Sequence, residues 1–354
     1  MEFGVLVPTK IDEIGAAVHA ENLGYSHVWV GDSQIIFSEC FATLALIAQQ
    51  TRTIKIGTGV AVAGLRIAPL AANGIATIAR LAPGRTFFGV GTGNSAWHLM
   101  GQKPVRMAEF GEYLRVVRAL LAGETVDYTI RGHTAPIKLL LTGWGFVELG
   151  HKIPIYVSAF GPKAQALTGQ YGDGLVISIP RVPTLEDAMV HVRQAAAQAG
   201  RTLGDDFHTC VLQSLAVLDP GEAPNSERIV RECGPAIMAA VHYIYEKLHK
   251  SGGEPPPFVR PIWKQFCALM EGTPPHLLHF KLHASHYTYL PPEEARLITP
   301  ELVKEVCMVG RAEEIVEQIR ELEKQGLKQI MFLPPPEHQY RMMEDFSRKV
   351  MRKL

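Results

Sequence analysis

The chain has 354 residues, and its 35 Lys and Arg residues balance its 35 Asp and Glu residues, so the formal net charge is zero. Hydrophobic residues make up 47% and charged residues 20%, which is typical of a globular protein with a sizeable core. The balanced charge argues against a nucleic-acid binder, because contacts to phosphates require an excess of basic residues.

The sequence shows no targeting signal. The first residues, MEFGVLVPTKIDEIG, lack a basic segment, and acidic residues interrupt their apolar run. No stretch approaches 18 uncharged apolar residues, so we expect no membrane span. The five cysteines lie far apart without a CxxC pair, which argues against a disulfide framework or a zinc–cysteine site. We therefore expect a cytoplasmic protein.

Short β-branched runs alternate with longer helical patterns from one end of the chain to the other. Eight runs predict strands: Glu2–Val7, His27–Val30, Thr53–Val62, Thr86–Gly91, Ile155–Ala159, Gly174–Ser178, Cys210–Leu218 and Gln329–Leu333. Helices are predicted between them, among them Ile11–Leu23, Glu39–Gln50, Met107–Leu121, Leu185–Ala199 and Ala312–Gln325. Strands that alternate with helices pair in parallel through right-handed crossovers, and eight such units favour a closed (β/α)₈ TIM barrel.

Two segments interrupt this alternation. Residues 124–153 predict a β-hairpin insertion, and residues 219–300 are far too long for an ordinary connection between a strand and a helix. An insertion of that size on a barrel is commonly a lid or an interface element. No linker separates two domains, so we expect one barrel domain over residues 1–354 with these insertions.

A glycine-rich turn follows the fourth predicted strand, in the segment Phe88–Ser95 (FGVGTGNS). Gly91 and Gly93 would let a flat or charged ligand approach the backbone, and Asn94 and Ser95 add polar contacts. The segment lacks the last glycine of the dinucleotide-binding fingerprint and lies in the fourth unit of the chain. A ligand-binding turn and an ordinary glycine-rich turn at the barrel rim both explain this pattern.

A second candidate is the turn after the fifth predicted strand, Ser158–Ala164 (SAFGPKA). Pro162 after Gly161 fits the first position of a helix. The N–H groups of Lys163 and Ala164 would then face outward at the positive end of that helix, where phosphate groups bind. An ordinary helix start is the alternative.

Further polar residues follow other predicted strands. Asp32, in the segment Gly31–Gln34 (GDSQ), suits a carboxylate that receives a hydrogen bond from a cofactor ring or serves as a base. It suits a helix cap equally well. Trp97 and His98, just past the glycine-rich turn, and Arg181, after the sixth strand, would overhang the same barrel mouth or serve in packing or at the surface.

Four histidines, His276, His279, His283 and His286, are spaced three, four and three residues apart, so a continuous helix would place them on one face. Such imidazoles suit a divalent metal, usually with carboxylates beside them, but no Asp or Glu lies between them. A histidine-rich pocket wall or a solvated face explains the spacing too, and we assign no residue to a metal.

Together these segments resemble the luciferase-like oxidoreductases, the superfamily of bacterial luciferase, alkanesulfonate monooxygenase and the F420-dependent methylenetetrahydromethanopterin reductases. The resemblance covers most of the chain and depends on the order and spacing of six segments. They are WVGDS, KIGTGVAVAGLR, FFGVGTGNS, GQKPVRMAEFGEYLRVVRALLAGE, YVSAFGPKAQALTGQYGDGLVI and VGRAEEIVEQIRELEKQGLKQI.

The resemblance implies a (β/α)₈ barrel that binds FMN or the deazaflavin F420 at its mouth, in a homodimer. It implies a non-prolyl cis peptide at Gly59–Val60 against the flavin ring and an acidic position near the ring at Asp32. Gly91 to Ser95 correspond to the turn beneath the cofactor, and Gly161 to Ala164 correspond to the phosphate-binding helix start.

Substrate residues are implied in the same way. Family members bind substrate above the ring and under the long insertion, which makes His98, His283 and Tyr287 candidate substrate contacts. His286 is the candidate acid or base, because a neutral imidazole titrates near working pH.

The choice of cofactor depends on two departures from the F420-dependent pattern. Ser33 follows Asp32, where those members often have histidine, and no compact Lys/Arg cluster is available for the acidic tail of F420. Both points favour FMN, although the GDSQ and PPEEARLITPEL segments look closer to the reductase-like branch.

Our first hypothesis is a two-component monooxygenase that uses O₂ and reduced FMN, delivered by a separate flavin reductase, on a small organic substrate. The alternative is F420-dependent hydride transfer to or from a carbonyl or imine. More distant alternatives are a metal-dependent barrel hydrolase and a flavin-binding protein without catalysis.

Overall fold

The computed structural model describes residues 1–178 and 184–354, so Arg181 lies outside the described residues. Contacts divide the chain into two compact units. The first contains Met1–Val211 and Gln325–Met331, and the second contains Leu212–Lys324 and Phe332–Leu354. We predicted a single domain over residues 1–354 and a lid at 219–300. Both remain predictions.

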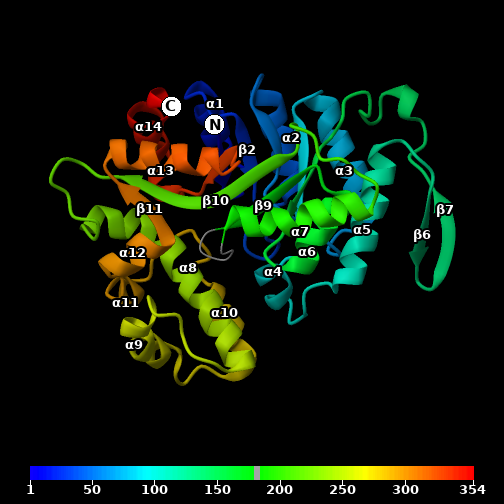
Figure 1. Ribbon diagram of the computed structural model, residues 1–354. Coiled ribbons are helices and arrows are strands. Elements are labelled where there is room, and N and C mark those ends of the chain that lie inside the picture. The colour runs from blue at the N-terminus through cyan, green and yellow to red at the C-terminus, as the bar shows by residue number, and fades with distance from the viewer. Residues whose placement is uncertain (179–183) are drawn as a thin grey trace. The chain divides into compact units, whose positions relative to one another are not determined.

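The strands of the first unit, with β10 and β12 leading into the second, form a closed parallel barrel (Figure 1). Among the described residues its strands are β1 (Glu2–Val7), β2 (His27–Val30), β3 (Lys55–Thr58) with β4 (Ala61–Val62), β5 (Thr86–Gly91), β8 (Ile155–Ser158), β9 (Gly174–Ser178), β10 (His208–Val217) and β12 (Gln329–Phe332). The hydrogen-bonded order runs β1-β2-β3-β5-β8-β9, then through β10 and β12 back to β1. The predicted (β/α)₈ barrel is therefore confirmed.

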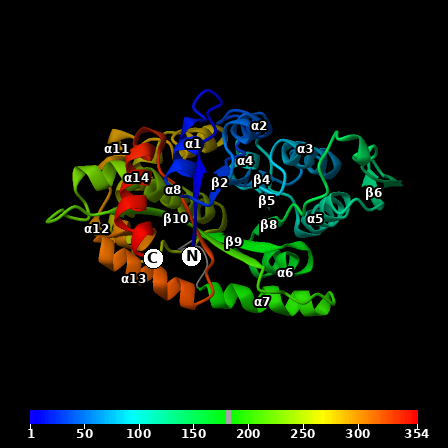
Figure 2. The same ribbon diagram turned by 90° about the horizontal axis from the view of Figure 1, so that it is seen from above.

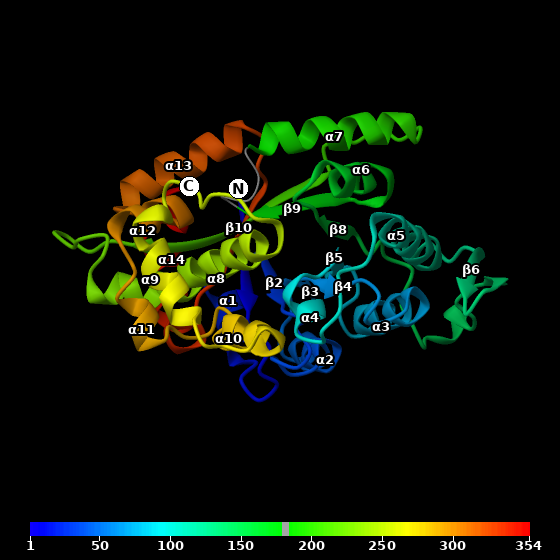
Figure 3. The same cartoon turned by 90° about the horizontal axis from the view of Figure 1, so that it is seen from below.

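Helices cover the outside of these strands, and α2, α3, α5, α6 and α7 contact one another in chain order (Figure 2). The helices of this unit are α1 (Gly15–Asn22), α2 (Cys40–Gln50), α3 (Ala68–Leu81), α4 (Ser95–His98), α5 (Met107–Leu121), α6 (Pro162–Tyr171) and α7 (Leu185–Gln198), with a 3₁₀ turn at Thr142–Trp144. An antiparallel hairpin, β6 (Val126–Ile130) and β7 (His133–Ile137), lies beside α5 within the segment 124–153 (Figure 3).

Two predicted elements differ from the structure. The strand expected over Thr53–Val62 is interrupted between β3 and β4, where the Gly59–Val60 peptide bond is cis. The sequence analysis also missed β11 (Cys307–Gly310), which pairs in parallel with the end of β10. This strand follows helix α12 without a break, so no turn residue marks where it begins.

Aromatic rings fill the barrel interior. The ring of Trp29 lies 4.4 Å from that of Phe87, and the ring of Tyr156 lies 5.3 Å from Phe87, measured between centroids. Gly89 makes this packing possible, since a methyl group there would lie 2.1 Å from the carbonyl oxygen of Thr58 and 2.9 Å from the Trp29 ring. The interior is a packed core, as it is in other barrels of eight strands.

The second unit is mainly helical. Its helices are α8 (Glu227–Ser251), α9 (Arg260–Met270), α10 (Leu278–His283), α11 (Pro292–Ala295), α12 (Pro300–Val306), α13 (Ala312–Lys324) and α14 (Gln339–Lys349), with 3₁₀ turns at Pro275–Leu277, Pro336–His338 and Met351–Lys353. Its apolar core includes fully buried side chains of Ile237 in α8, Phe266 in α9 and Leu302 in α12.

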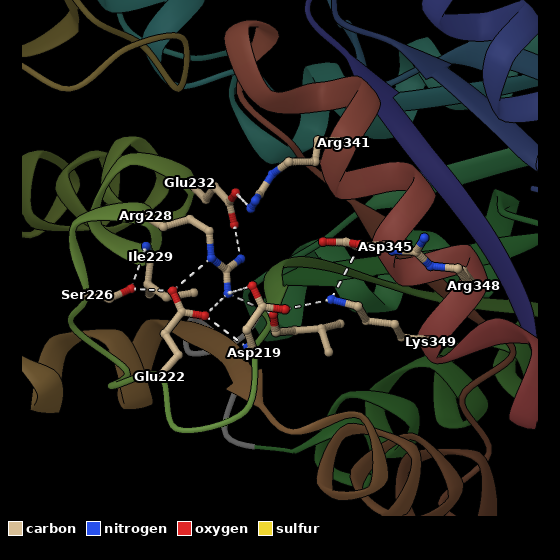
Figure 4. Close-up of polar contacts among 11 residues, drawn as sticks. Asp219, Glu222, Ser226, Arg228, Ile229, Glu232, Arg341, Asp345, Arg348 and Lys349 are labelled. Carbon is tan, nitrogen blue, oxygen red and sulfur yellow. Dashed lines mark hydrogen bonds and ion pairs between the residues drawn. The ribbon is translucent and has the colours of Figure 1, made fainter.

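Charged side chains fix the amino-terminal end of α8 within this unit (Figure 4). Arg228 donates hydrogen bonds to Glu222 at 2.8 Å and to Glu232 at 2.9 Å. Arg341 of α14 also pairs with Glu232, which is only 2% exposed. The hydrogen bond from Arg228 lowers the pKa of Glu222 to about 2. These pairs hold α8 to α14 and to the turn that follows β10.

Candidate functional site at the carboxyl ends of the barrel strands

Three of the predicted cofactor residues meet where neighbouring strands end. A methyl group on Gly91, the last residue of β5, would lie 3.2 Å from Cγ2 of Val60 and 3.2 Å from Cβ of Ser158. Val60 immediately precedes β4 and forms the cis peptide bond with Gly59, as the resemblance implies, and Ser158 ends β8. These residues therefore share one patch at the carboxyl ends of the strands, where barrel enzymes place their active sites.

The glycine-rich turn packs against the same region. Gly93 has a φ of +67°, and a methyl group there would lie 2.3 Å from Cγ1 of Val62, so both backbone conformation and space require glycine. Asn94 precedes α4, and Ser95 begins it. The side-chain amide of Gln34 donates to the carbonyl oxygen of Ala96 at 3.0 Å and ties the loop after β2 to α4.

Asp32 forms the charged part of this site. Its carboxylate accepts a hydrogen bond from Arg66 Nη1 at 2.7 Å and one from the Val62 N–H at 3.3 Å. The residue is only 5% exposed, and this burial raises the pKa of Asp32, while the bonds from Arg66 and Val62 oppose the rise. Helix α2 is capped by Glu39, which accepts from the Ala42 N–H at 2.7 Å, so Asp32 is not the cap of that helix.

Arg66 is the member of this group that the sequence analysis missed. It pairs with both Asp32 and Glu39, and its guanidinium carbon lies 4.9 Å from the ring centre of Phe41. The arginine ends the KIGTGVAVAGLR segment, four residues past the end of β4. An arginine shortly after a barrel strand was the available signal. One guanidinium and two carboxylates give this cluster a formal net charge of −1.

The start of α6 fits an anionic group. Gly161 is the residue before the helix, Pro162 is its first residue, and no side chain caps the helix. A methyl group on Gly161 would meet no atom within 4 Å, so open space lies in front of this backbone. The N–H groups of Lys163 and Ala164 belong to the first turn, which has no intrahelical acceptor for them. The exposed Lys163 adds a positive charge there.

His98 lies at the end of α4 and is half-buried. Its neighbour Trp97 contacts the loop after β4, since a methyl group on Gly64 would lie 3.1 Å from the Trp97 ring. Both residues thus follow the glycine-rich turn in the first unit, as expected, and a substrate contact by His98 stays a prediction.

The other candidate substrate residues belong to the second unit. His283 is buried at the end of α10, and its Nε2 lies 4.0 Å from a carboxylate oxygen of Glu246 in α8. His286 and Tyr287 follow in a turn with φ values of +27° and +66°, and the centroid of the His286 ring lies 5.9 Å from that of His283 and 5.4 Å from that of Tyr287. Their roles in catalysis and in substrate binding stay predictions.

The histidine spacing does not correspond to one helix. The helix ends at His283, so His286 lies beyond it on a backbone of positive φ, and a 3₁₀ turn holds His276 before α10 begins. The interpretation of four histidines on one continuous helical face is therefore wrong. Among the described residues, no three of these histidines bring ligand atoms together in a metal-binding group.

Comparison with known proteins identifies the family. The family model described as luciferase-like monooxygenase matches residues 1–329. The chain belongs to this family. It is accordingly a flavin- or deazaflavin-dependent oxidoreductase of the luciferase-like class, as the sequence predicts. No helix in the described part of the chain combines the length and the apolar character that crossing a membrane requires.

The alignments with individual relatives cover different shares of the chain. A 5,10-methylenetetrahydromethanopterin reductase from Archaeoglobus fulgidus is 27% identical over 346 residues, which cover 94% of this chain and 92% of that protein. An F420-dependent glucose-6-phosphate dehydrogenase from Beutenbergia cavernae is 30% identical over 218 residues, which cover 55% of this chain and 61% of that protein.

Two solved structures show the same fold. The F420-dependent tetrahydromethanopterin reductase from Methanopyrus kandleri aligns with a TM-score of 0.70 at 19% identity, over 99% of each chain. The oxygenating constituent of 3,6-diketocamphane monooxygenase from Pseudomonas putida, in complex with FMN, aligns with a TM-score of 0.61 at 18% identity, over 100% of this chain and 98% of that one.

Proposed function

We propose that this protein is an F420-dependent oxidoreductase that transfers a hydride to or from a carbonyl or imine carbon of a small organic substrate. The observation that carries the proposal is the similarity to a methylenetetrahydromethanopterin reductase along nearly the whole of both chains. An F420-dependent dehydrogenase among the relatives supports it over more than half of this chain. The relatives thus favour the alternative of the sequence analysis over its first hypothesis, the FMN monooxygenase.

The residues at the strand ends fit a flat, phosphate-bearing cofactor. Val60, Gly91 and Ser158 form a surface of small groups on which a ring would lie, and Gly161 leaves open space before the α6 N–H groups, which would receive a phosphate. F420 would supply the hydride-carrying carbon when bound. Asp32 stays buried and paired with Arg66, so it holds a fixed charge beside this surface.

The roles of the remaining residues are part of the proposal. We assign the proton transfer that accompanies hydride transfer to His286, and contacts to the substrate to His98, His283 and Tyr287. A homodimer is proposed on the resemblance alone. A separate flavin reductase would be a partner only if the protein used FMN. That alternative is retained because a monooxygenase of the same fold binds FMN.

Cofactor titrations test the proposal. Purified protein is titrated with F420 and with FMN, each oxidised and reduced, and binding is followed by absorbance and fluorescence. We expect selective binding of F420, weakened by Gly161→Val, which would fill the space before α6, and unchanged by the matched surface variant Gly132→Ala in the β6–β7 turn. Tight binding of reduced FMN with no affinity for F420 would return the assignment to the monooxygenase.

A further inference from the structure

We propose that the end of the barrel opposite the cofactor surface contains a binding site for a divalent transition metal, formed by Glu2, His27 and His208. One ligand atom from each residue lies within 4.8 Å of those of the other two. The three residues are the first of β1, β2 and β10, whereas Gly91 and Ser158 end their strands. Because the strands are parallel, the two sites lie at opposite ends of the barrel.

The hydrogen bonds of His27 fix its tautomer. The hydroxyl of Ser26 donates its one hydrogen to the carbonyl oxygen of Phe3 at 2.8 Å, and the same hydroxyl oxygen lies 2.8 Å from His27 Nδ1. Nδ1 must therefore donate to Ser26, which leaves Nε2 with a lone pair and no hydrogen. His27 is fully buried, and its Nε2 has no hydrogen-bond partner among the described residues.

A buried acceptor without a donor is costly unless a ligand satisfies it. A metal-bound imidazole has this arrangement, in which the second nitrogen donates to a neighbouring oxygen and fixes the ring. The bond from His27 to Ser26 is therefore the outer-shell contact that a metal ligand requires, and it is present before any metal binds.

His208 and Glu2 complete the set. Nδ1 of His208 lies 3.8 Å from a carboxylate oxygen of Glu2, and the His208 and His27 ring centres are 5.5 Å apart. Nε2 of His208 is buried and has no hydrogen-bond partner among the described residues, so it too is available as a ligand. Two imidazoles and one carboxylate are a common set for zinc and for related divalent metals, with a further position left for water.

The geometry permits closure on a metal. Bonds of about 2.0–2.2 Å in a tetrahedral site place ligand atoms about 3.3 Å apart, so the present group must contract by roughly 1.5 Å. Glu2 can supply this movement, because its side chain is 38% exposed and its other partner is Lys55, 3.1 Å away and 47% exposed. On binding, the metal would take the place of the Lys55 ammonium beside the Glu2 carboxylate. Because the Glu2 side chain is partly exposed, the ion could enter the site from solvent past this residue.

Cobalt binding tests the proposal on the full-length protein after treatment with a chelator. We expect Co²⁺ to bind with one-to-one stoichiometry and a visible absorption band, Zn²⁺ to displace it, and saturating Zn²⁺ to raise the Tm by about 3–5 °C. Glu2→Gln should lower the Co²⁺ affinity at least about tenfold. Lys55→Ala should raise it, since the carboxylate then loses its competing cation. Both variants alter half-exposed side chains, so both should fold.

The histidine-rich segment supplies the matched control. His279→Ala should leave the cobalt band and the affinity unchanged, because His279 lies in α10, outside the proposed set. The proposal is overturned if the protein binds no stoichiometric Co²⁺, or if binding persists undiminished in Glu2→Gln and disappears in His279→Ala. Neither outcome depends on which flavin the protein uses.

Discussion

Acid should destabilise this barrel through His208 before most carboxylates titrate. Burial lowers the pKa of His208 to about 4 from its ordinary value of 6.5, and burial also lowers that of the neighbouring His27. Between pH 6.5 and about 4, His208 binds a proton in the unfolded chain but stays unprotonated in the folded chain. The free energy of unfolding therefore falls as the pH falls through this window. The shift of His208 corresponds to about 3 kcal/mol, which is a large part of the 5–15 kcal/mol typical of folded domains.

Urea unfolding at pH 7.5, 6.5, 5.5 and 4.5, with chelator present throughout, measures this loss. The lower limit keeps Glu222 out of the window, since its pKa is about 2. His208→Gln should remove the part of the pH dependence of the free energy of unfolding that His208 contributes and leave the part due to His27, whereas His133→Gln, at an exposed position in the hairpin, should leave all of it intact. A wild-type stability that stays constant between pH 6.5 and 4.5, or an unchanged slope in His208→Gln, would refute the reasoning.

Three further predictions concern the Asp32–Arg66 pair, two glycines and His286. Arg66→Met should lower the free energy of unfolding by about 3 kcal/mol in urea, because it leaves Asp32 buried without its cation; unchanged stability would show that this pair contributes nothing. Gly89→Ala should cost at least about 2 kcal/mol, through the clash with Thr58, whereas Gly161→Ala should stay within about 0.5 kcal/mol of wild type by the same measurement; equal losses would contradict the assigned packing. His286→Ala should lower kcat at least about 100-fold with little change in F420 affinity, and normal turnover would remove it from the mechanism.

The fold could be predicted from the sequence because its signals are local. Runs such as Glu2–Val7 and Thr86–Gly91 are continuous and β-branched or aromatic, as strands buried on both faces are, and their observed bounds match the predicted ones. Gly24 and Gly123 marked helix ends correctly, since each has the positive φ that glycine adopts after a helix. No glycine or other turn residue marks the start of β11, so the sequence analysis missed this strand.

The sites were harder to predict because they depend on contacts between distant segments. Asp32 stood out after its strand, but only the structure shows that Arg66 neutralises it. His27 and His208 give no motif, since ring closure of the barrel alone brings β2 and β10 near each other at this end. Conversely, the regular spacing up to His286 suggested one helix, but α10 ends at His283, and His286 has a positive φ beyond it.

Anaerobic turnover with reduced F420 tests the central claim most directly. Purified protein is mixed with reduced F420 and a panel of small carbonyl and imine compounds without oxygen, and the reoxidation of F420 is followed by absorbance. We predict substrate-dependent reoxidation, with one hydride delivered to product for each F420 consumed. Turnover that occurs only with reduced FMN and ¹⁸O₂, and that places ¹⁸O in the product, would contradict the claim.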